Sequence, residues 1–173
     1  MKLVSGGQTG VDRAVLDVAI ECGFDYGGWC PKGGWAEDLT RPPGLLAKYP
    51  KLRETPIADP AQRTQWNARD CDACMIVGDA GIIAASKGTA LGQKMAHWYR
   101  KPMFVADLNH PDTSDRAVRW LSAQREAFGD DFKLGGPRES EAPGIYSRTA
   151  AFLRKTIGHA DTAPAAAKPR SRG

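Results

Sequence analysis

The sequence predicts a single α/β domain of the doubly wound type, with a mostly parallel sheet of about five strands and helices on both faces. Strand-like apolar runs alternate with amphipathic helical stretches along the chain. These runs are continuously apolar, as is typical of parallel strands covered on both sides. With 173 residues, of which 42% are hydrophobic, the chain is long enough for one sizeable core but short for two.

The first unit is a strand followed by a helix. The run "KLVSG" (2–6) predicts a short strand, and from Val11 the apolar positions recur at helical spacing until Gly23 ends the helix. We expect Thr9 to cap this helix, with Asp12 as the acidic partner in a capping box.

The next stretch is harder to interpret. The segment "FDYGGWC" (24–30) predicts a second strand, whereas residues 31–58 show no sustained period. Loops of that length without secondary structure are uncommon in compact domains. The segment therefore either binds a ligand or contains helices or strands that its pattern does not reveal. The dipeptide Asp59-Pro60 is typical of a helix start, and the helix should run through residue 70.

The rest of the chain continues the alternation. In order, the patterns predict a strand over 73–78, a Gly- and Ala-rich bend over 79–88, a helix from Thr89 to Arg100, a strand over 103–108, a helix from about Thr113 that Gly129 stops, a short strand over 132–137, and a last helix over 146–157. Residues 158–173 are rich in Ala, Pro and Arg without a hydrophobic face. We expect a domain over 1–157 and a disordered tail over 158–173.

Composition excludes several classes of partner. The formal net charge is +4, but Lys168, Arg170 and Arg172 against Asp161 place half of it in the last residues. The remaining charge is too small for a nucleic-acid-binding face. The start "MKLVSGG" lacks the apolar core of a signal peptide, and no run reaches the ~20 apolar residues of a membrane helix. We therefore expect a cytoplasmic protein that binds neither nucleic acid nor membrane.

No catalytic or metal-binding set is visible in the sequence. The three histidines are far apart, and no Ser-His-Asp arrangement or metal-ligand spacing occurs. The pair "CDAC" follows a helical stretch, whereas a thioredoxin-type pair begins a helix. We expect free, buried or half-buried thiols at Cys22, Cys30, Cys71 and Cys74.

The loop "SGGQTG" (5–10) lies between the first strand and the first helix. Ser5, Gly7 and Gly10 occupy the three glycine positions of a dinucleotide fingerprint, but the expected acidic residue downstream is missing. A Walker A lysine is missing too. The glycines, the hydroxyl of Thr9 and the helix N-terminus favour anion binding, the alternative being a tight turn with ordinary capping.

Further groups are expected near this loop. Lys32, with Gly33 beside it, ends the second strand, and "SKGTA" provides a second set of free amides at a helix start. Two such starts indicate a ligand with more than one anionic group. The expected ligand-binding residues are Gly6, Gly7, Gln8, Thr9, Gly10, Asp12, Arg13, Lys32, Gly33, Lys87, Gly88 and Thr89. Weaker polar candidates are Glu37, Asp38, Arg53, Arg63, Asn67, Arg69 and Arg138.

Seven ordered segments carry a family resemblance: "SGGQTGVDRAVLD", "GGWCPKG", "AED", "YPKLRETP", "RTQWNARDCDACMIV", "KGTAL" and "GGPRESEAPGIY". Over residues 1–157 the chain resembles the "putative molybdenum carrier" family, a circularly permuted branch of the SLOG superfamily related to lysine-decarboxylase-like phosphoribohydrolases. The resemblance implies a Rossmann-like fold and homo-oligomers. It also implies a nucleotide-like or pterin-type phosphorylated ligand, either molybdenum cofactor for delivery to molybdoenzymes or a nucleotide or dinucleotide.

One position departs from the hydrolase relatives. Their "GGxGTxxE" segment ends in a glutamate that helps cleave the N-glycosidic bond, and Gly92 stands there in this chain. A glycine cannot transfer the proton that this chemistry needs. The sequence therefore favours a carrier or sensor that binds its ligand. The alternative is a nucleotide-processing hydrolase or transferase, in which Glu37, Asp38 or Glu139 would substitute from a loop.

Overall fold

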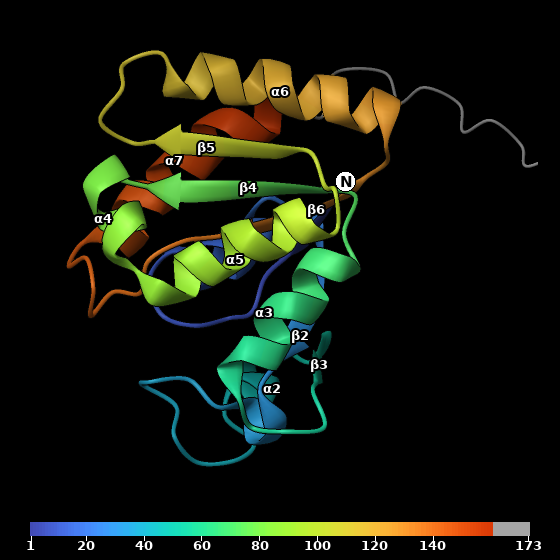
Figure 1. The fold of residues 1–173 in the computed structure, drawn as a ribbon, viewed down its shortest axis with the longest axis vertical. Helices are drawn as coiled ribbons and strands as arrows, with labels where there is room; N and C mark the ends of the chain where they lie inside the picture. Colours follow the sequence, from blue (N-terminus) through green and yellow to red (C-terminus); the bar gives the residue numbers. More distant parts are fainter. Residues whose placement is uncertain (161–173) are drawn as a thin grey trace, which may run out of the picture.

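The computed structural model describes residues 1–160 and contains one six-stranded sheet (Figure 1). The strands are β1 (Lys2–Val4), β2 (Asp25–Cys30), β3 (Leu52–Glu54), β4 (Ala73–Gly78), β5 (Met103–Asp107) and β6 (Asp131–Gly135). The helices are α1 (Val11–Glu21), the 3-10 turn η1 (Lys32–Gly34), α2 (Leu45–Lys48), α3 (Pro60–Arg69), α4 (Ala80–Ala85), α5 (Lys87–Trp98), α6 (Thr113–Ala127) and α7 (Ile145–Ala160). Residues 161–173 of the expected tail lie outside the described part.

All strand pairs are parallel, in the order β3-β2-β1-β6-β4-β5. The predicted doubly wound α/β class is thereby confirmed, with six strands in place of five. The last strand, β6, lies in the middle, where Lys133 is in register with Val4 on one side and Cys74 on the other. Ligands of such sheets bind beyond the carboxyl ends of the strands, where the chain changes direction.

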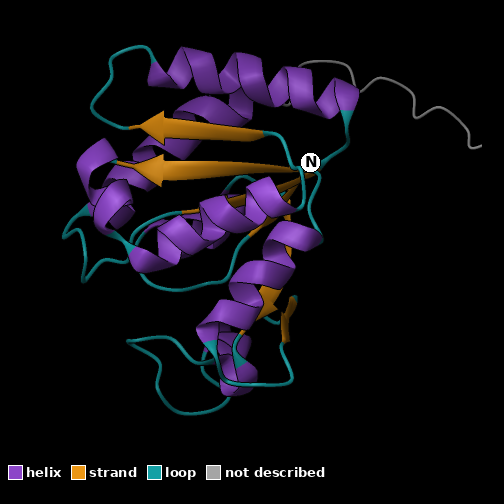
Figure 2. Cartoon of the chain, viewed as in Figure 1, coloured by secondary structure: helices purple, strands orange, loops and turns teal. Residues whose placement is uncertain are grey.

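Helices cover both faces of the sheet, as Figure 2 shows. Helices α1, α6 and α7 pack together on one face, and α3 and α5 pack against each other on the opposite face. Phe132 and Leu134 of β6 belong to the larger core cluster, which includes α1 and α7 residues. Because side chains alternate along a strand, Lys133 between them faces the α3 and α5 side.

Four short elements could not be predicted from the sequence. The stretch 31–58 contains η1, α2 and β3, which are too short to show a period. The predicted bend over 79–88 contains α4, and α5 begins at Lys87 instead of Thr89. Ser86 caps α5, because its Oγ accepts a hydrogen bond from Thr89 N at 3.3 Å.

The predicted Thr9 cap of α1 is wrong. Gly10 is the N-cap, with φ 72°, and no side chain caps the helix. The Thr9 hydroxyl instead donates to the Glu37 carboxylate and accepts from Glu139 N at 3.3 Å. A Cβ on Gly10 would lie 2.6 Å from Pro137 O, so only glycine allows the segment after β6 to lie against this helix start.

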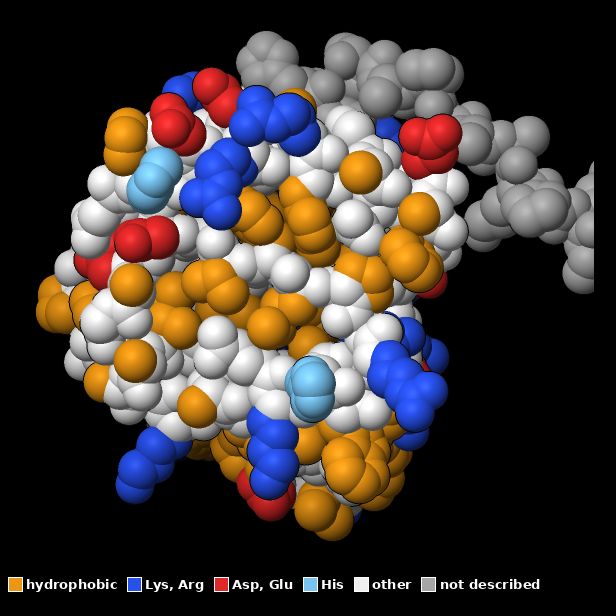
Figure 3. Space-filling model, turned by 45° about the horizontal axis from the view of Figure 1, so that its top comes forward, with side chains coloured by type: hydrophobic (Ala, Val, Ile, Leu, Met, Phe, Trp, Pro, Cys, Tyr) orange, Lys and Arg blue, Asp and Glu red, His pale blue; other side chains and the backbone are white. Residues whose placement is uncertain are grey.

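The edge strand β5 is only partly covered. Met103 and Val105 are each 40% exposed, and nearby Trp98 at the end of α5 is 72% exposed. Figure 3 shows apolar side chains gathered across this side of the molecule, with lysines and arginines around them. Among residues 1–160 no helix has the length and apolar character needed to cross a membrane.

The four cysteines are free thiols, as expected. Cys30, Cys71 and Cys74 are buried, but Cys22 is exposed, because it follows the last turn of α1 at the surface. Cys71 Sγ and Cys74 Sγ lie 3.5 Å apart where β4 begins.

Candidate functional site

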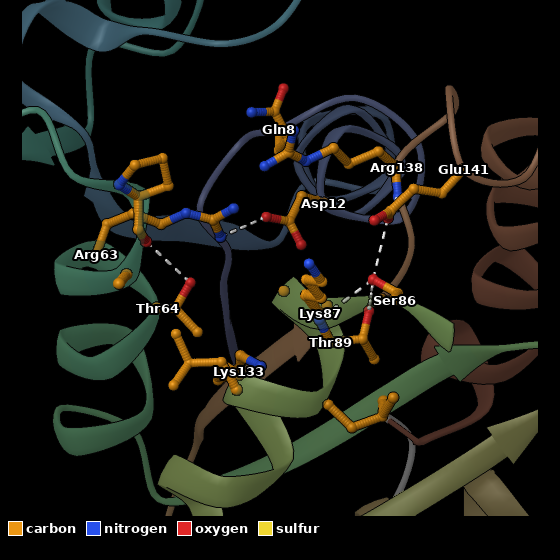
Figure 4. A pocket seen from close by; sticks show the side chains of 17 residues that line it. Gln8, Asp12, Arg63, Thr64, Ser86, Lys87, Thr89, Lys133, Arg138 and Glu141 are labelled. Carbon is orange, nitrogen blue, oxygen red and sulfur yellow. Dashed lines mark hydrogen bonds and ion pairs between the residues drawn. The ribbon is translucent and has the colours of Figure 1, made fainter. Parts of the chain in front are cut away.

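A cavity of about 210 Å³ opens at the carboxyl edge of the sheet, on the side of α3 and α5. The loop before α1, the first turns of α3 and α5, strands β4 and β6, and the segment after β6 all contribute to its lining. Figure 4 shows polar side chains from these segments converging on it. The sheet topology brings them together, because parallel strands end at the same edge.

Lys133 lines the inner part of this cavity and is 6% exposed. Its ammonium makes no hydrogen bond or ion pair with any of the residues 1–160 that the structure describes, and because the nitrogen is not fully shielded it is accessible from the cavity. Burying an uncompensated charge is costly, so such a group is retained where something else supplies the opposite charge. The position of Lys133 therefore indicates an anionic ligand.

Two glycines make room around Lys133. A Cβ on Gly92 of α5 would lie 3.0 Å from Lys133 Nζ, and a Cβ on Gly135 would lie 3.3 Å from it. The same Cβ on Gly135 would lie 3.0 Å from Asp12 Oδ1. Any larger residue at either position would occupy the space next to the ammonium.

Two helix N-termini border the cavity. Ser86, Lys87, Gly88 and Thr89 at the start of α5 line one side, and Pro60 and Ala61 at the start of α3 line another. Helix N-termini carry a partial positive charge and unpaired amides, which together favour bound anions. Ser86 caps α5 through Thr89 N, which leaves the amides of Lys87 and Gly88 for a ligand. At α3, Pro60 has no N–H, and Ala61 N and Gln62 N both donate to Asp59, so this start has no amide left to donate.

An ion pair forms the wall between α1 and α3. Arg63 donates from Nη1 to Asp12 Oδ2 at 2.8 Å, and the two side chains are only 13% and 7% exposed. Arg63 also lies over Gly6, where a Cβ would clash with its guanidinium. Its buried Nε has no hydrogen-bond partner in the described part of the chain.

The rim contains further charges. Lys87 is exposed at the cavity, and Arg138 lies 3.8 Å from Glu37 through Nη1. Glu141 accepts from Ser86 Oγ at 3.0 Å and from Arg138 N at 2.9 Å, which ties the loop after β6 to α5. The lining thus holds four cations, Arg63, Lys87, Lys133 and Arg138, against the carboxylates of Asp12 and Glu141.

The cavity can now be compared with known proteins. Residues 3–157 match the model of the circularly permutated YpsA SLOG family. The chain belongs to this family. A 1.45 Å crystal structure of a "Putative molybdenum carrier protein" from Syntrophus aciditrophicus SB is 35% identical, with a TM-score of 0.78 over 90% of this chain and 94% of that one. No curated protein matches.

In this SLOG protein, five of the sequence-predicted residues line the cavity: Gln8, Asp12, Lys87, Gly88 and Thr89. Thr9, Gly10 and Arg13 line a separate hollow of about 420 Å³ on the other side of the loop. Gly6 lies beneath Arg63, and Gly7 packs against Leu45 and Leu52. Lys32 and Gly33 on η1 line neither hollow, and Gly33 N donates to Glu54 Oε2 at 2.6 Å.

Several backbone amides of the opening loop and the first residue of α1 donate hydrogen bonds within the protein. Ser5 N donates to Gly27 O at 3.0 Å, Thr9 N to Gln8 Oε1 at 3.1 Å, and Val11 N to Pro137 O at 3.2 Å. From this region, Gln8 of the loop and Asp12 in the first turn of α1 line the cavity. The helix N-termini that line the cavity are those of α5 and α3, whereas the sequence predicted those of α5 and α1.

The weaker candidates separate into two groups. Arg63 and Arg138 line the cavity, whereas Asn67 is structural, since its Oδ1 accepts from Trp29 N at 2.7 Å and its Nδ2 donates to Trp29 O at 2.9 Å. Arg69 pairs with Asp70, and Arg53 lies over the Trp29 ring. Glu37, Asp38 and Glu139 are outside the cavity lining. Among residues 1–160 no group of three or more His, Cys, Asp or Glu is placed to hold a metal.

Lys133 and Glu141 are the charged residues of the cavity lining that sequence reasoning missed. A lysine within "DFKLG" is a usable signal, because a strand covered on both faces has no solvent for an ammonium. Lys133 also affects the thiols beneath it. The hydrogen bond from Cys71 lowers the pKa of Cys74, and the ammoniums of Lys133 and Lys101 lower it further against the effect of burial.

Proposed function

We propose that this protein binds a small phosphorylated ligand, nucleotide-like or pterin-type, with the phosphate in the cavity between α3 and α5. The ammonium of Lys133, which has no partner among the described residues and lines the same cavity as the N-terminus of α5, carries this proposal. A phosphate would supply the missing negative charge and accept hydrogen bonds from the Arg63 guanidinium and the α5 amides. Molybdenum cofactor is one such ligand, and the proposed role is that of a carrier or sensor.

The size of the cavity fits the charged end of such a molecule. Sites for drug-sized ligands measure roughly 300–1,000 Å³, so a cavity of about 210 Å³ holds the phosphate and its nearest atoms. The rest of the ligand would extend past Lys87 and Arg138 at the rim. Delivery of the ligand to another protein would require such an exposed part.

The test is isothermal titration calorimetry and thermal shift with AMP, ADP, GDP, ADP-ribose, NAD and a molybdopterin preparation. We expect saturable binding by at least one of them. A charged hydrogen bond contributes about 1.5–3 kcal/mol, so Lys133→Met should weaken binding roughly 10- to 100-fold. The variant should fold with an equal or higher Tm, because methionine fills a similar volume without a buried charge.

The matched control is Lys94→Met, which removes the same charge from an exposed position on α5. It should bind like the wild type. The proposal fails if no member of the panel binds, or if both variants lose affinity equally. Chromatography of the incubated ligands tests the hydrolase or transferase alternative, for which Asp12 and Glu141 are the cavity carboxylates, and released base or sugar phosphate would favour it.

A further inference from the structure

We infer that the cavity selects ligands that end in a free phosphate, in preference to ligands whose phosphate is substituted on both sides. This inference rests on the proposed function and narrows its ligand class. It separates nucleotides and other molecules with a terminal phosphate from dinucleotides such as NAD and from ADP-ribose. The observations that carry it are the closed inner end of the cavity and the charge placed there.

The inner end of the cavity is closed by packed apolar residues. Lys133 is in register with Cys74 on the neighbouring strand, and Cys74 belongs to a buried cluster with Ala68, Cys71 and Ala96. Each of these four residues is at most 2% exposed. A phosphate that reaches Lys133 therefore has no exit behind it.

The space next to the ammonium is also narrow. Thr64 Cγ2 and Ile76 Cδ1 would lie 3.9 and 4.0 Å from a Cβ on Gly92, so side chains bound the room that this glycine leaves. Gly135 leaves a second space between Lys133 and Asp12. The space at Gly92 suits a phosphate oxygen, because it adjoins the ammonium, whereas a second ester substituent directed inward would meet Thr64 or Ile76.

The charge of the cavity also favours ligands that end in a free phosphate. A terminal phosphate carries about −1.5 to −2 at neutral pH, whereas a phosphate esterified on both sides carries only one negative charge. The cavity lining has more cations than carboxylates, and the buried ammonium lacks a counterion among the described residues. The more highly charged group therefore compensates the site better.

The experiment compares matched pairs by calorimetry at pH 7.5: AMP with its methyl phosphodiester, and ADP with ADP-ribose. We expect the free-phosphate member of each pair to bind at least 10-fold more tightly. Lys133→Met should reduce this preference to less than about threefold, while Lys94→Met should preserve it. The Tm of each variant shows that the fold is intact.

The outcomes separate the two proposals. Equal affinity within the pairs, or tightest binding by NAD or ADP-ribose, would overturn this inference and leave the proposed function standing. A preference that persists in Lys133→Met would also overturn it, since the selection would then come from elsewhere. Failure of every phosphorylated compound in both experiments, molybdopterin included, would overturn the proposed function and the inference together.

Discussion

Gly92 on α5 lowers the stability of the helix but leaves space for the side chain of Lys133. Gly92 lies within the helix and is buried, and its missing Cβ leaves room for Lys133 Nζ. Glycine inside a helix is less favourable than alanine by roughly 0.5–1 kcal/mol. Gly92 therefore gives up some helix stability, and the space that it leaves beside the ammonium of Lys133 belongs to the cavity lining.

At this scale we predict that Gly92→Ala makes the protein more stable and a weaker binder. The alanine should raise the Tm by roughly 1–4 °C, since 1 kcal/mol corresponds to about 2–4 °C in a chain of this size. Its Cβ displaces Lys133 Nζ, so affinity for a phosphorylated ligand should fall. Differential scanning fluorimetry and calorimetry measure the two effects.

The control is Gly81→Ala on α4, where a Cβ would meet nothing within 4 Å. It should leave affinity unchanged. If Gly92→Ala bound the ligand as tightly as the wild type, the space beside Lys133 would have no role in binding.

At the scale of elements, Asp17 of α1 holds three segments together. Its carboxylate accepts from Tyr49 Oη at 2.6 Å after α2, from Tyr146 Oη at 2.9 Å on α7, and from Lys48 Nζ at 3.1 Å. Partial burial acts to raise the pKa of Asp17, but the hydrogen bonds from Tyr49, Lys48 and Tyr146 outweigh it and the pKa is lowered. The ionised carboxylate is therefore the form that stabilises the fold.

We predict that Asp17→Asn lowers the free energy of unfolding at pH 7 by about 1–3 kcal/mol, as expected for hydrogen bonds to a charged group. A lowered folded-state pKa stabilises the protein above the unfolded value of about 3.9, and this stabilisation is lost as pH falls through the folded pKa. Urea unfolding at pH 7 and pH 3 should show the variant approaching the wild type at the lower pH. Exposed Glu126→Gln is the control, and a pH-independent difference would contradict the prediction.

The length and burial of each element decided whether it could be predicted from the sequence. Long periodic elements such as α1 and α6 and the apolar strand β4 were predictable, because burial imposes their patterns. The short β3 and α4 show no period, and their form depends on tertiary contacts. Half of the site was predictable from local chemistry at Asp12 and the start of α5. Lys133 required the sheet order, because no local pattern says that β6 lies between β1 and β4.

At the scale of the whole molecule, β5 leaves one edge of the sheet open. Met103 and Val105 on this strand and Trp98 beside it are exposed apolar side chains, and exposed edges of this kind are ready to pair with another chain. We propose that this surface, defined by Trp98, Met103 and Val105, contacts a second copy of the chain.

We predict that Val105→Lys shifts the protein toward the monomer, because a charge within this surface opposes its burial. Light scattering coupled to size-exclusion chromatography would measure the mass of both forms. Arg41→Gln, which removes an exposed charge from the loop before α2, serves as the control for an unrelated charge change. A wild-type monomer, or an oligomer of unchanged mass in Val105→Lys, would contradict the assignment of this surface.

The central position of β6 has a consequence for synthesis. When the ribosome has released β1 through β5, the two halves of the sheet still lack the strand that joins them, and Lys133, Gly135 and Arg138 follow near the end of the chain. The proposed anion site therefore forms only after β6 and the segment that follows it have been made. A nascent or prematurely terminated chain would have its opening loop and α5 but no floor between them, and could not sequester the ligand.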